Sequence, residues 1–249
     1  MQTERQPEPQ PALRRLDGVR VAITGGTSGL GLALVHELTR RGASVAFVAR
    51  TADRVAQIAA EEAAHGIVGD VSIKHDIHPI ALQITGRLGG LDVLVNNASD
   101  LGPVPLALLG DTQCEDFERA LQTNVLGPFR LTKALLGALA ASARQGRGAV
   151  VLNISSDAAV QAYERWGAYG ASKAALAHMT RIWNAEAVAH GIRFLALDPG
   201  DMDTPMHALA VPDADRAQLR PPADAAHDLA DAIADLLPRH VPAVVRCAS

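Results

Sequence analysis

The sequence predicts a single α/β domain of the Rossmann type, in which a doubly wound parallel sheet forms the middle of three α/β/α layers. From Val19 onward, short apolar runs alternate with longer helical patterns, which favours parallel pairing with right-handed crossovers. Runs such as VAFVA, LDVLV and AVVLNI are continuously apolar, as expected for strands that are buried on both faces. A length of 249 residues suits one domain of this class.

A glycine-rich turn opens this fold at residues 19–31, which read VRVAITGGTSGLG. The pattern indicates a strand, a tight turn and the start of a helix. Gly25, Gly29 and Gly31 lie where a Cβ would obstruct the turn or keep the backbone from a bound phosphate, and a helix N-terminus favours an anion. Such turns also occur where nothing binds, so the turn alone leaves a nucleotide site and a purely structural turn both open.

The later strands are expected at residues 44–49, 67–68, 91–95, 149–154 and 192–197, with a closing strand at 241–245. Ligands of open parallel sheets bind at the carboxyl ends of the strands. The residues that end the strands therefore become candidate contacts. They are Arg50, Thr51, Asp70, Val71, Asn96, Asn97, Ala98, Ser155, Ser156, Pro199 and Gly200.

The domain is expected to span residues 17–249, and residues 1–16 are expected to form a disordered N-terminal tail, because their Gln, Glu and Pro content offers little apolar surface. Residues 204–222 are read as an excursion of the same domain that covers the substrate as a lid.

Composition excludes several classes of function. The net charge of −4, without a long basic run, predicts no nucleic-acid partner and no membrane partner. Cys114 and Cys247 fit no disulfide framework, and neither they nor the nine histidines have metal-ligand spacing, so no metal is expected. The absence of a secretory leader pattern and of a long apolar stretch favours a cytoplasmic protein.

Several motifs occur together in a fixed order. Thr24 to Gly31 matches TGxxxGxG, Asn96-Asn97-Ala98 matches most of NNAG with Ser99 in place of the glycine, and Tyr169 to Lys173 matches YxxxK. Ser156 stands thirteen residues before Tyr169, and Pro199-Gly200 is followed by Thr204. In these motifs the sequence resembles the short-chain dehydrogenase/reductase family over nearly all of residues 19–245.

The resemblance implies a catalytic set of Asn124, Ser156, Tyr169 and Lys173. Tyr169 and Lys173 are four residues apart, so on a helix they share a face, and we expect the ammonium to stabilise the phenolate. Tyr169 would exchange a proton with the substrate oxygen, Ser156 would donate a hydrogen bond to it, and Lys173 would bind the nicotinamide ribose. Without Tyr169, Ser156 would read as a hydroxyl that ends a strand.

Asn124 precedes Pro128 by four residues within an apolar helical pattern. Proline has no N–H, so the carbonyl of Asn124 should lose its helical partner and the helix should kink there. The resemblance implies that this asparagine binds a water that relays protons by way of the lysine. A kink that only wraps the helix around the sheet is compatible with the same pattern.

The resemblance also implies a set of contacts to a nicotinamide dinucleotide. They are Gly25, Thr27, Ser28, Gly29, Leu30, Gly31, Arg50, Thr51, Asp70, Val71, Asn96, Ala98, Tyr169, Lys173, Pro199, Gly200, Met202 and Thr204. The second strand ends in Arg50 without an acidic residue, which favours NADP(H) over NAD(H), since a guanidinium suits a ribose 2′-phosphate. The alternative is that Arg50 is a simple surface arginine.

Together these features predict an NADP(H)-dependent oxidoreductase that reversibly reduces the carbonyl of a small molecule to a secondary alcohol. Imine and enoyl substrates stay open, and a non-catalytic NADP(H)-binding regulatory or redox-sensing module is the alternative. A homodimer or homotetramer through the helices after Asp116 and Gly167 is expected, mainly from the resemblance. Asp157 is read as a solvated loop residue, with a substrate contact as the alternative, and Asp201, Asp203 and His207 as weak candidates for recognising a polar or cationic group.

Overall fold

The computed structural model describes residues 14–238 and contains the predicted parallel sheet. The six strands are β1 (Arg20–Thr24), β2 (Ser44–Ala49), β3 (His65–Val68), β4 (Val93–Asn96), β5 (Ala149–Ile154) and β6 (Ile192–Leu197). They pair in the order β3-β2-β1-β4-β5-β6, and every pairing is parallel. The strand expected at residues 241–245, Cys247 and most of the expected tail lie outside the described residues.

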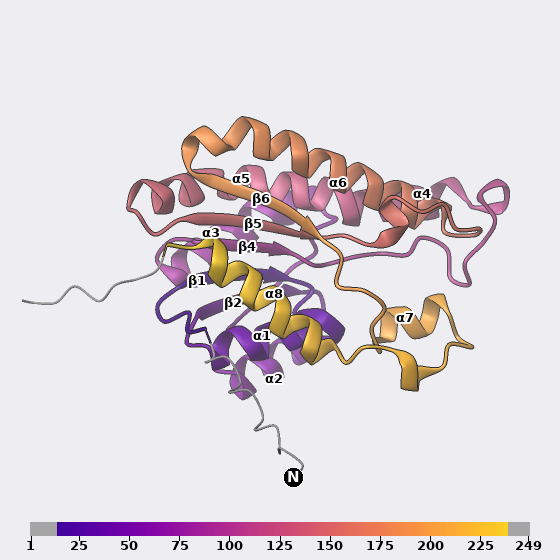
Figure 1. Cartoon of the computed structure of the whole chain (residues 1–249), viewed down its shortest axis with the longest axis horizontal. Helices are drawn as coiled ribbons and strands as arrows, with labels where there is room; N and C mark the ends of the chain where they lie inside the picture. The colour runs from indigo at the N-terminus through magenta and orange to yellow at the C-terminus, as the bar shows by residue number, and fades with distance from the viewer. Residues whose placement is uncertain (1–13, 239–249) are drawn as a thin grey trace, which may run out of the picture.

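Helices cover both faces of the sheet (Figure 1). One face carries α1 (Gly29–Arg40), α2 (Ala52–Glu61) and α8 (Pro222–Leu236), and the other carries α3 (Ile77–Leu88), α5 (Gly127–Arg144) and α6 (Gly167–Ala187). Successive strand side chains point to opposite faces, so Ile23 packs in the first core and Ala22 in the second. Both faces of the four inner strands, β2, β1, β4 and β5, are therefore buried, which explains their uninterrupted apolar runs.

The sheet reverses its strand order next to β1, which pairs with β2 on one side and β4 on the other. The arrowheads of the strands point toward the side of the molecule on which α7 (Pro205–Ala210) lies apart from the sheet (Figure 1). The segment around α7 leaves and rejoins the domain at one point, because Met202 bridges Arg220 and the N–H of Asp203 donates to the Arg220 carbonyl at 3.0 Å. The residues between Asp203 and Arg220 therefore form a loop whose two ends are hydrogen-bonded to each other.

The helix that carries Asn124 is interrupted where the sequence predicts a kink. Helix α4 (Cys114–Leu121) passes into a π-helical turn at Gln122–Leu126, and α5 begins at Gly127 with Pro128 in its first turn. Short 3₁₀ helices also occur at Lys74–Asp76, Leu109–Asp111, Asp157–Ala159, Val188–His190 and Arg216–Gln218. No helix within residues 14–238 combines the length and apolarity that crossing a membrane requires.

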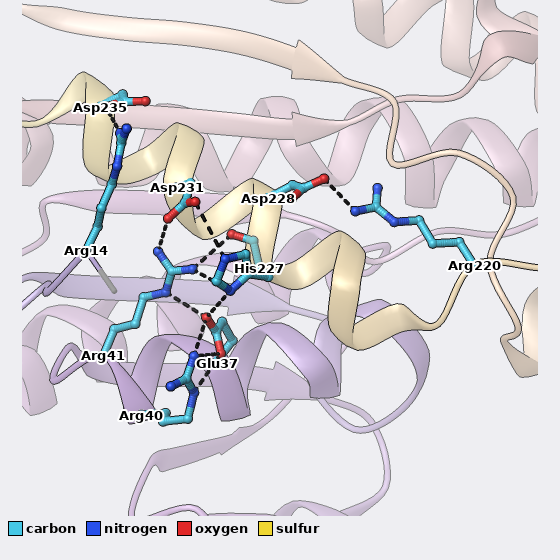
Figure 2. Close-up of polar contacts among 9 residues, drawn as sticks. All are labelled: Arg14, Glu37, Arg40, Arg41, Arg220, His227, Asp228, Asp231 and Asp235. Atoms are coloured by element: carbon cyan, nitrogen blue, oxygen red, sulfur yellow. Dashed lines mark hydrogen bonds and ion pairs between the residues drawn. The ribbon is translucent and has the colours of Figure 1, made fainter. Parts of the chain in front are cut away.

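A buried charge network joins α8 to α1 (Figure 2). The Arg41 side chain is fully buried; its Nε donates to Glu37 at 2.7 Å, and its guanidinium also contacts Asp231 and the carbonyl of His227. Burial acts to raise the pKa of Glu37, but hydrogen bonds from Arg41 and Arg40 outweigh it and hold that pKa below its usual value. The network fixes the helix that begins at the glycine-rich turn.

The ordered domain begins before the predicted boundary at residue 17. Leu16 is buried in the core beside α1 and α8, and its N–H donates to the carbonyl of Arg41 at 2.9 Å. Leu16 is the first large apolar residue before the turn at Asp17 and Gly18, and burying it stabilises the start of β1.

Candidate active site

A cavity of about 910 Å³ opens at the carboxyl ends of the strands. Its walls come from the turn between β1 and α1, from the segments that follow β2 to β6, and from the excursion around α7. Every residue predicted to contact the cofactor lines this cavity except Asn96. The topology thus brings together side chains that are separated by up to 180 residues of sequence, from Gly25 to Thr204.

The glycine-rich turn is packed too tightly for side chains. Gly25 has a φ of +73°, and a Cβ on Gly31 would lie 2.0 Å from the Gly25 carbonyl oxygen. The first turn of α1 contains no acidic residue, and its cap residue Ser28 is exposed. Free N–H groups at the start of a helix therefore face the cavity without a competing carboxylate, which fits the phosphates of a dinucleotide.

The two asparagines that end β4 have different roles. Asn97 lines the cavity and donates to the carbonyl of Thr24 at 2.9 Å, so it supports the glycine-rich turn. Asn96 points to the other side of the strand, where its amide donates to Asn153 at 2.8 Å inside the protein. Neighbouring strand residues face opposite ways, so Asn97 lines the cavity, whereas Asn96, which the motif had included among the cofactor contacts, does not.

The ends of β2 and β3 form the part of the cavity expected to hold the adenosine. Arg50 and Thr51 are exposed and line the cavity, and within residues 14–238 Arg50 forms no ion pair. Asp70 also lines the cavity, and its carboxylate accepts from the N–H and hydroxyl of Ser72 at 2.9 and 2.7 Å. Arg50 thus presents a guanidinium that is free to meet an anion.

Tyr169 and Lys173 lie in the wall of the cavity and are 9% and 2% exposed. The ammonium of Lys173 lies 5.4 Å from the centroid of the Tyr169 ring and donates to the Ile154 carbonyl at 2.8 Å. Burial raises the pKa of Tyr169 to about 12, although the hydroxyls of Ser156 and Ser99 act to lower it. Burial lowers the pKa of Lys173 to about 8, against the charge of Asp198, which acts to raise it.

These values reverse the sequence-based expectation that the ammonium would lower the pKa of the phenol. The pairing in space is present, but loss of solvation dominates, because both side chains are removed from water. At neutral pH the phenol of Tyr169 therefore keeps its proton. The protonated side chain lies in the wall of the cavity.

Ser156 lies beside Tyr169 and is held by its neighbours. Its Oγ accepts from the N–H of Ala158 at 3.2 Å and donates to the carboxylate of Asp157 at 3.1 Å. The other oxygen of Asp157 accepts from the hydroxyl of Tyr163 at 2.6 Å. The Tyr163 hydrogen bond keeps the pKa of Asp157 below its usual value; burial opposes this and Ser156 adds to it. Asp157, predicted from the sequence to be a solvated loop residue, is therefore ionised, and its carboxylate contacts the Ser156 hydroxyl.

Asn124 is fully buried and does not line the cavity. Its amide donates to the carbonyl of Asp100 at 2.7 Å and to the hydroxyl of Ser172 at 2.8 Å, and its oxygen accepts from the N–H of Asp100 at 2.7 Å. Ser99 also donates to that oxygen at 3.2 Å. The Asn124 side chain thus joins the segment after β4 to α6 and supports the wall of the cavity from behind.

Of the acidic residues on the excursion, Asp203 is neutralised by Arg216, whose guanidinium donates to both its oxygens at 2.8 and 2.9 Å. Asp201 and His207 line the cavity, and the Nε2 atom of His207 lies 3.9 Å from a carboxylate oxygen of Asp201. Several lining residues were missed by sequence reasoning, among them Asp198, Tyr163, Trp166 and Met206. Asp198 directly precedes the Pro199-Gly200 motif and could have been found there; the other three carry no motif.

Comparisons with known proteins agree with this geometry. A family model described as short chain dehydrogenase matches residues 20–215. An L-fucose dehydrogenase of Mus musculus is 32% identical over 198 residues, which cover 78% of this chain and 69% of that protein. Across curated relatives, the matches cover between 56% and 76% of the relative's length.

Two solved structures are similar in fold. The 3-ketoacyl-(acyl-carrier-protein) reductase from Brucella melitensis complexed with NADH has a TM-score of 0.80 at 27% identity, covering 86% of this chain and 90% of its own. A short chain dehydrogenase from Burkholderia cenocepacia in complex with NADP has a TM-score of 0.77 at 27% identity, covering 88% and 91%.

Proposed function

The chain belongs to the short-chain dehydrogenase/reductase family, and from that premise we propose that it reversibly reduces a carbonyl to a secondary alcohol with NADP(H). The observation that carries this proposal is the protonated Tyr169, nine-tenths buried beside Ser156 and Lys173 in a cavity large enough for a dinucleotide and a small molecule. A buried phenol that keeps its proton suits the general acid of a reduction.

The residues along the cavity suit a nicotinamide dinucleotide. The turn from Gly25 to Gly31 would hold the pyrophosphate, Asp70 and Val71 the adenine, and Pro199 to Thr204 the nicotinamide end. When bound, this cofactor supplies or accepts the hydride. Structural relatives with NADH and with NADP support the class of cofactor.

The chain's own residues would handle the proton. Tyr169 would donate its hydroxyl proton to the substrate oxygen as the alcohol forms, and Ser156 would donate a hydrogen bond that fixes that oxygen. Lys173, held by the Ile154 carbonyl, would bind the ribose. Asn124 would act from behind the cavity wall, with its backbone carbonyl in the π-helical turn as the proposed acceptor for a relaying water.

The preference for NADP(H) rests on Arg50. A guanidinium with no ion pair among the described residues, at the end of a strand that lacks an acid there, would meet a 2′-phosphate. The test is kcat/KM with NADPH and NADH against a panel of ketones and aldehydes. We expect a preference for NADPH of roughly ten- to hundredfold, the value of one charge-assisted contact, and its loss in Arg50→Ala.

Arg54→Ala is the matched control, because Arg54 lies on the exposed side of α2 outside the cavity. A parent protein that prefers NADH would refute the assignment. A protein that binds NADPH but reduces no carbonyl would favour the regulatory module instead. A cytoplasmic location, and self-association through α5 and α6, belong to the same proposal.

A further inference from the structure

Six carboxylates line the cavity, and three of them, on Asp157, Asp198 and Asp201, lie close enough to Tyr163 to affect its pKa. All three act on the same phenol: the pKa of Tyr163 is raised by its hydrogen bond to Asp157, by burial, and by the charges of Asp157, Asp201 and Asp198. The acids come from two segments, those that follow β5 and β6, which are neighbouring strands. They therefore form one negative field rather than three separate surface charges.

Little positive charge balances this field inside the cavity. The cationic or ionisable bases among its lining residues are Arg50, Lys173 and His207. Arg50 follows β2, three strand spacings from β5, which is about 14 Å at roughly 4.8 Å per spacing. Lys173 interacts with Asp198, whose charge acts to raise its pKa, but its ammonium is buried and donates to the Ile154 carbonyl. The Nε2 atom of His207 lies 3.9 Å from Asp201 and carries charge only when protonated.

An apolar surface lies next to the acids. Leu101, Ala158 and Tyr169 form a small buried cluster, against which Trp166 and Met206 pack, and both of these side chains line the cavity. The Trp166 ring meets the Tyr169 ring edge to face, with centroids 5.5 Å apart. Aromatic rings beside carboxylates provide both parts of a site for an organic cation, because ring faces attract cations as well.

We propose that the substrate is a carbonyl compound that carries a protonated amine, bound with the ammonium group at Asp157 and the apolar body against Trp166 and Met206. Asp198 and Asp201 strengthen the attraction without having to touch the amine. This inference rests on the proposed function and names the substrate class for the same site.

The position of Asp157 couples recognition of the amine to catalysis. Ser156 has one hydroxyl proton, and while it donates that proton to Asp157 the hydroxyl must turn before it can donate to a substrate carbonyl. An ammonium group that binds Asp157 takes over as the donor to the carboxylate and leaves the Ser156 hydroxyl free to turn to the substrate oxygen. A neutral ketone of the same shape offers no such replacement.

The hydrogen bond between Ser156 and Asp157 limits the distance between the amine and the carbonyl group of the substrate. The Ser156 Oγ lies 3.1 Å from the Asp157 carboxylate, and a bonded substrate oxygen would lie about 2.8 Å beyond Ser156, so that oxygen is at most about 6 Å from the carboxylate. An ammonium nitrogen about 2.8 Å from the carboxylate is then at most about 9 Å from the substrate oxygen. A protonated amine about two to five bonds from the carbonyl carbon meets that limit.

The test uses three methyl ketones of equal chain length, which end in a dimethylammonium, an isopropyl or a carboxylate group. We expect kcat/KM with NADPH to be roughly ten- to hundredfold higher for the ammonium ketone than for the isopropyl ketone, and lowest for the carboxylate. The ratio of kcat/KM for the ammonium ketone to that for the isopropyl ketone should fall to about threefold or less in Asp157→Asn, and by a smaller factor in Asp201→Asn. In the parent protein this ratio should also decrease with added salt, because salt screens the charges.

Asp213→Asn is the control, because Asp213 is exposed on the same excursion but does not line the cavity. It should retain the parental ratio. Equal kcat/KM for the ammonium and isopropyl ketones in the parent, or a ratio unchanged in Asp157→Asn, would overturn the inference while leaving the proposed function intact.

Binding is measured in parallel by the fluorescence of Trp166, in a Trp183→Phe background that leaves it as the only tryptophan. If no ketone is reduced, the proposed function fails, and the binding order decides the inference by itself. Tighter binding of the ammonium ketone that depends on Asp157 supports the inference, and equal binding of all three ketones overturns it.

Discussion

Gly31→Ala tests how the fold builds the phosphate-binding turn. The added Cβ would lie 2.0 Å from the Gly25 carbonyl oxygen and 2.5 Å from the Asn97 amide nitrogen. An ordinary C···O contact is about 3.3 Å, so the turn must move by about 1 Å, and an overpacked site of this kind costs about 1–3 kcal/mol. For a domain of this size the melting temperature should fall by roughly 2–12 °C.

The same displacement should weaken NADPH binding at least about tenfold, the equivalent of one charge-assisted hydrogen bond. Gly86→Ala is the matched control: Gly86 lies exposed within α3, and a Cβ there meets nothing within 4 Å. It should stabilise the protein by about 0.5–1 kcal/mol and leave binding intact. Thermal unfolding and calorimetric titration measure both quantities. A Gly31→Ala protein that melts and binds like the Gly86→Ala control would refute the reasoning.

Two further predictions concern buried charges away from the cavity. Burial acts to raise the pKa of Asp92, but hydrogen bonds from Arg20, Arg147 and Ser142 hold this pKa far below its usual value of 3.8. The ionised carboxylate therefore stabilises the folded protein above pH 3.8, and this stabilisation is lost as the pH falls toward the lowered pKa. Asp92→Asn should therefore lower the free energy of unfolding by about 2–4 kcal/mol at pH 7 and make it less dependent on pH in the acid range. Urea unfolding measured as a function of pH tests this, and a variant with the parental pH profile would contradict it. Arg41→Ala, which leaves the Glu37 carboxylate buried, should cost about 3–5 kcal/mol, and less in a Glu37→Gln background. Equal losses in both backgrounds would show that the pair contributes little.

The parallel strands, the helix layers and the glycine-rich turn were predictable because they follow from local patterns. Uninterrupted apolar runs such as 149–154 indicate strands covered on both faces, and parallel connections restrict how these strands pair. The π-helical turn at Asn124 was partly predictable, since Pro128 removes a backbone donor four residues later. The sequence indicated a break there but not its π geometry.

The contacts within the site were less predictable because they depend on orientation and burial. Asn97 lines the cavity and Asn96 does not, because the two neighbouring residues face opposite sides of the strand. A motif alone does not show which of two adjacent strand residues faces the cavity. The pKa of Tyr169 is raised because burial removes water from its phenol oxygen. This burial depends on how the helices pack, so the sequence does not show it. Likewise, Asp157 meets Tyr163 across a loop whose course no periodic pattern predicts.

The account's central claim is that Tyr169 is the proton donor of a carbonyl reduction, and Tyr169→Phe tests it most directly. The substitution removes one oxygen and keeps the ring that packs against Trp166, so the fold and the Kd for NADPH should change little. Tyr163→Phe removes a hydroxyl from the same cavity and serves as the control, with an expected loss in kcat of less than about tenfold. The decisive measurement is single-turnover reduction of a ketone by NADPH, for which the account predicts a loss of about 10²–10⁴-fold in Tyr169→Phe. A folded Tyr169→Phe protein that retains more than about a tenth of the parental rate would contradict it.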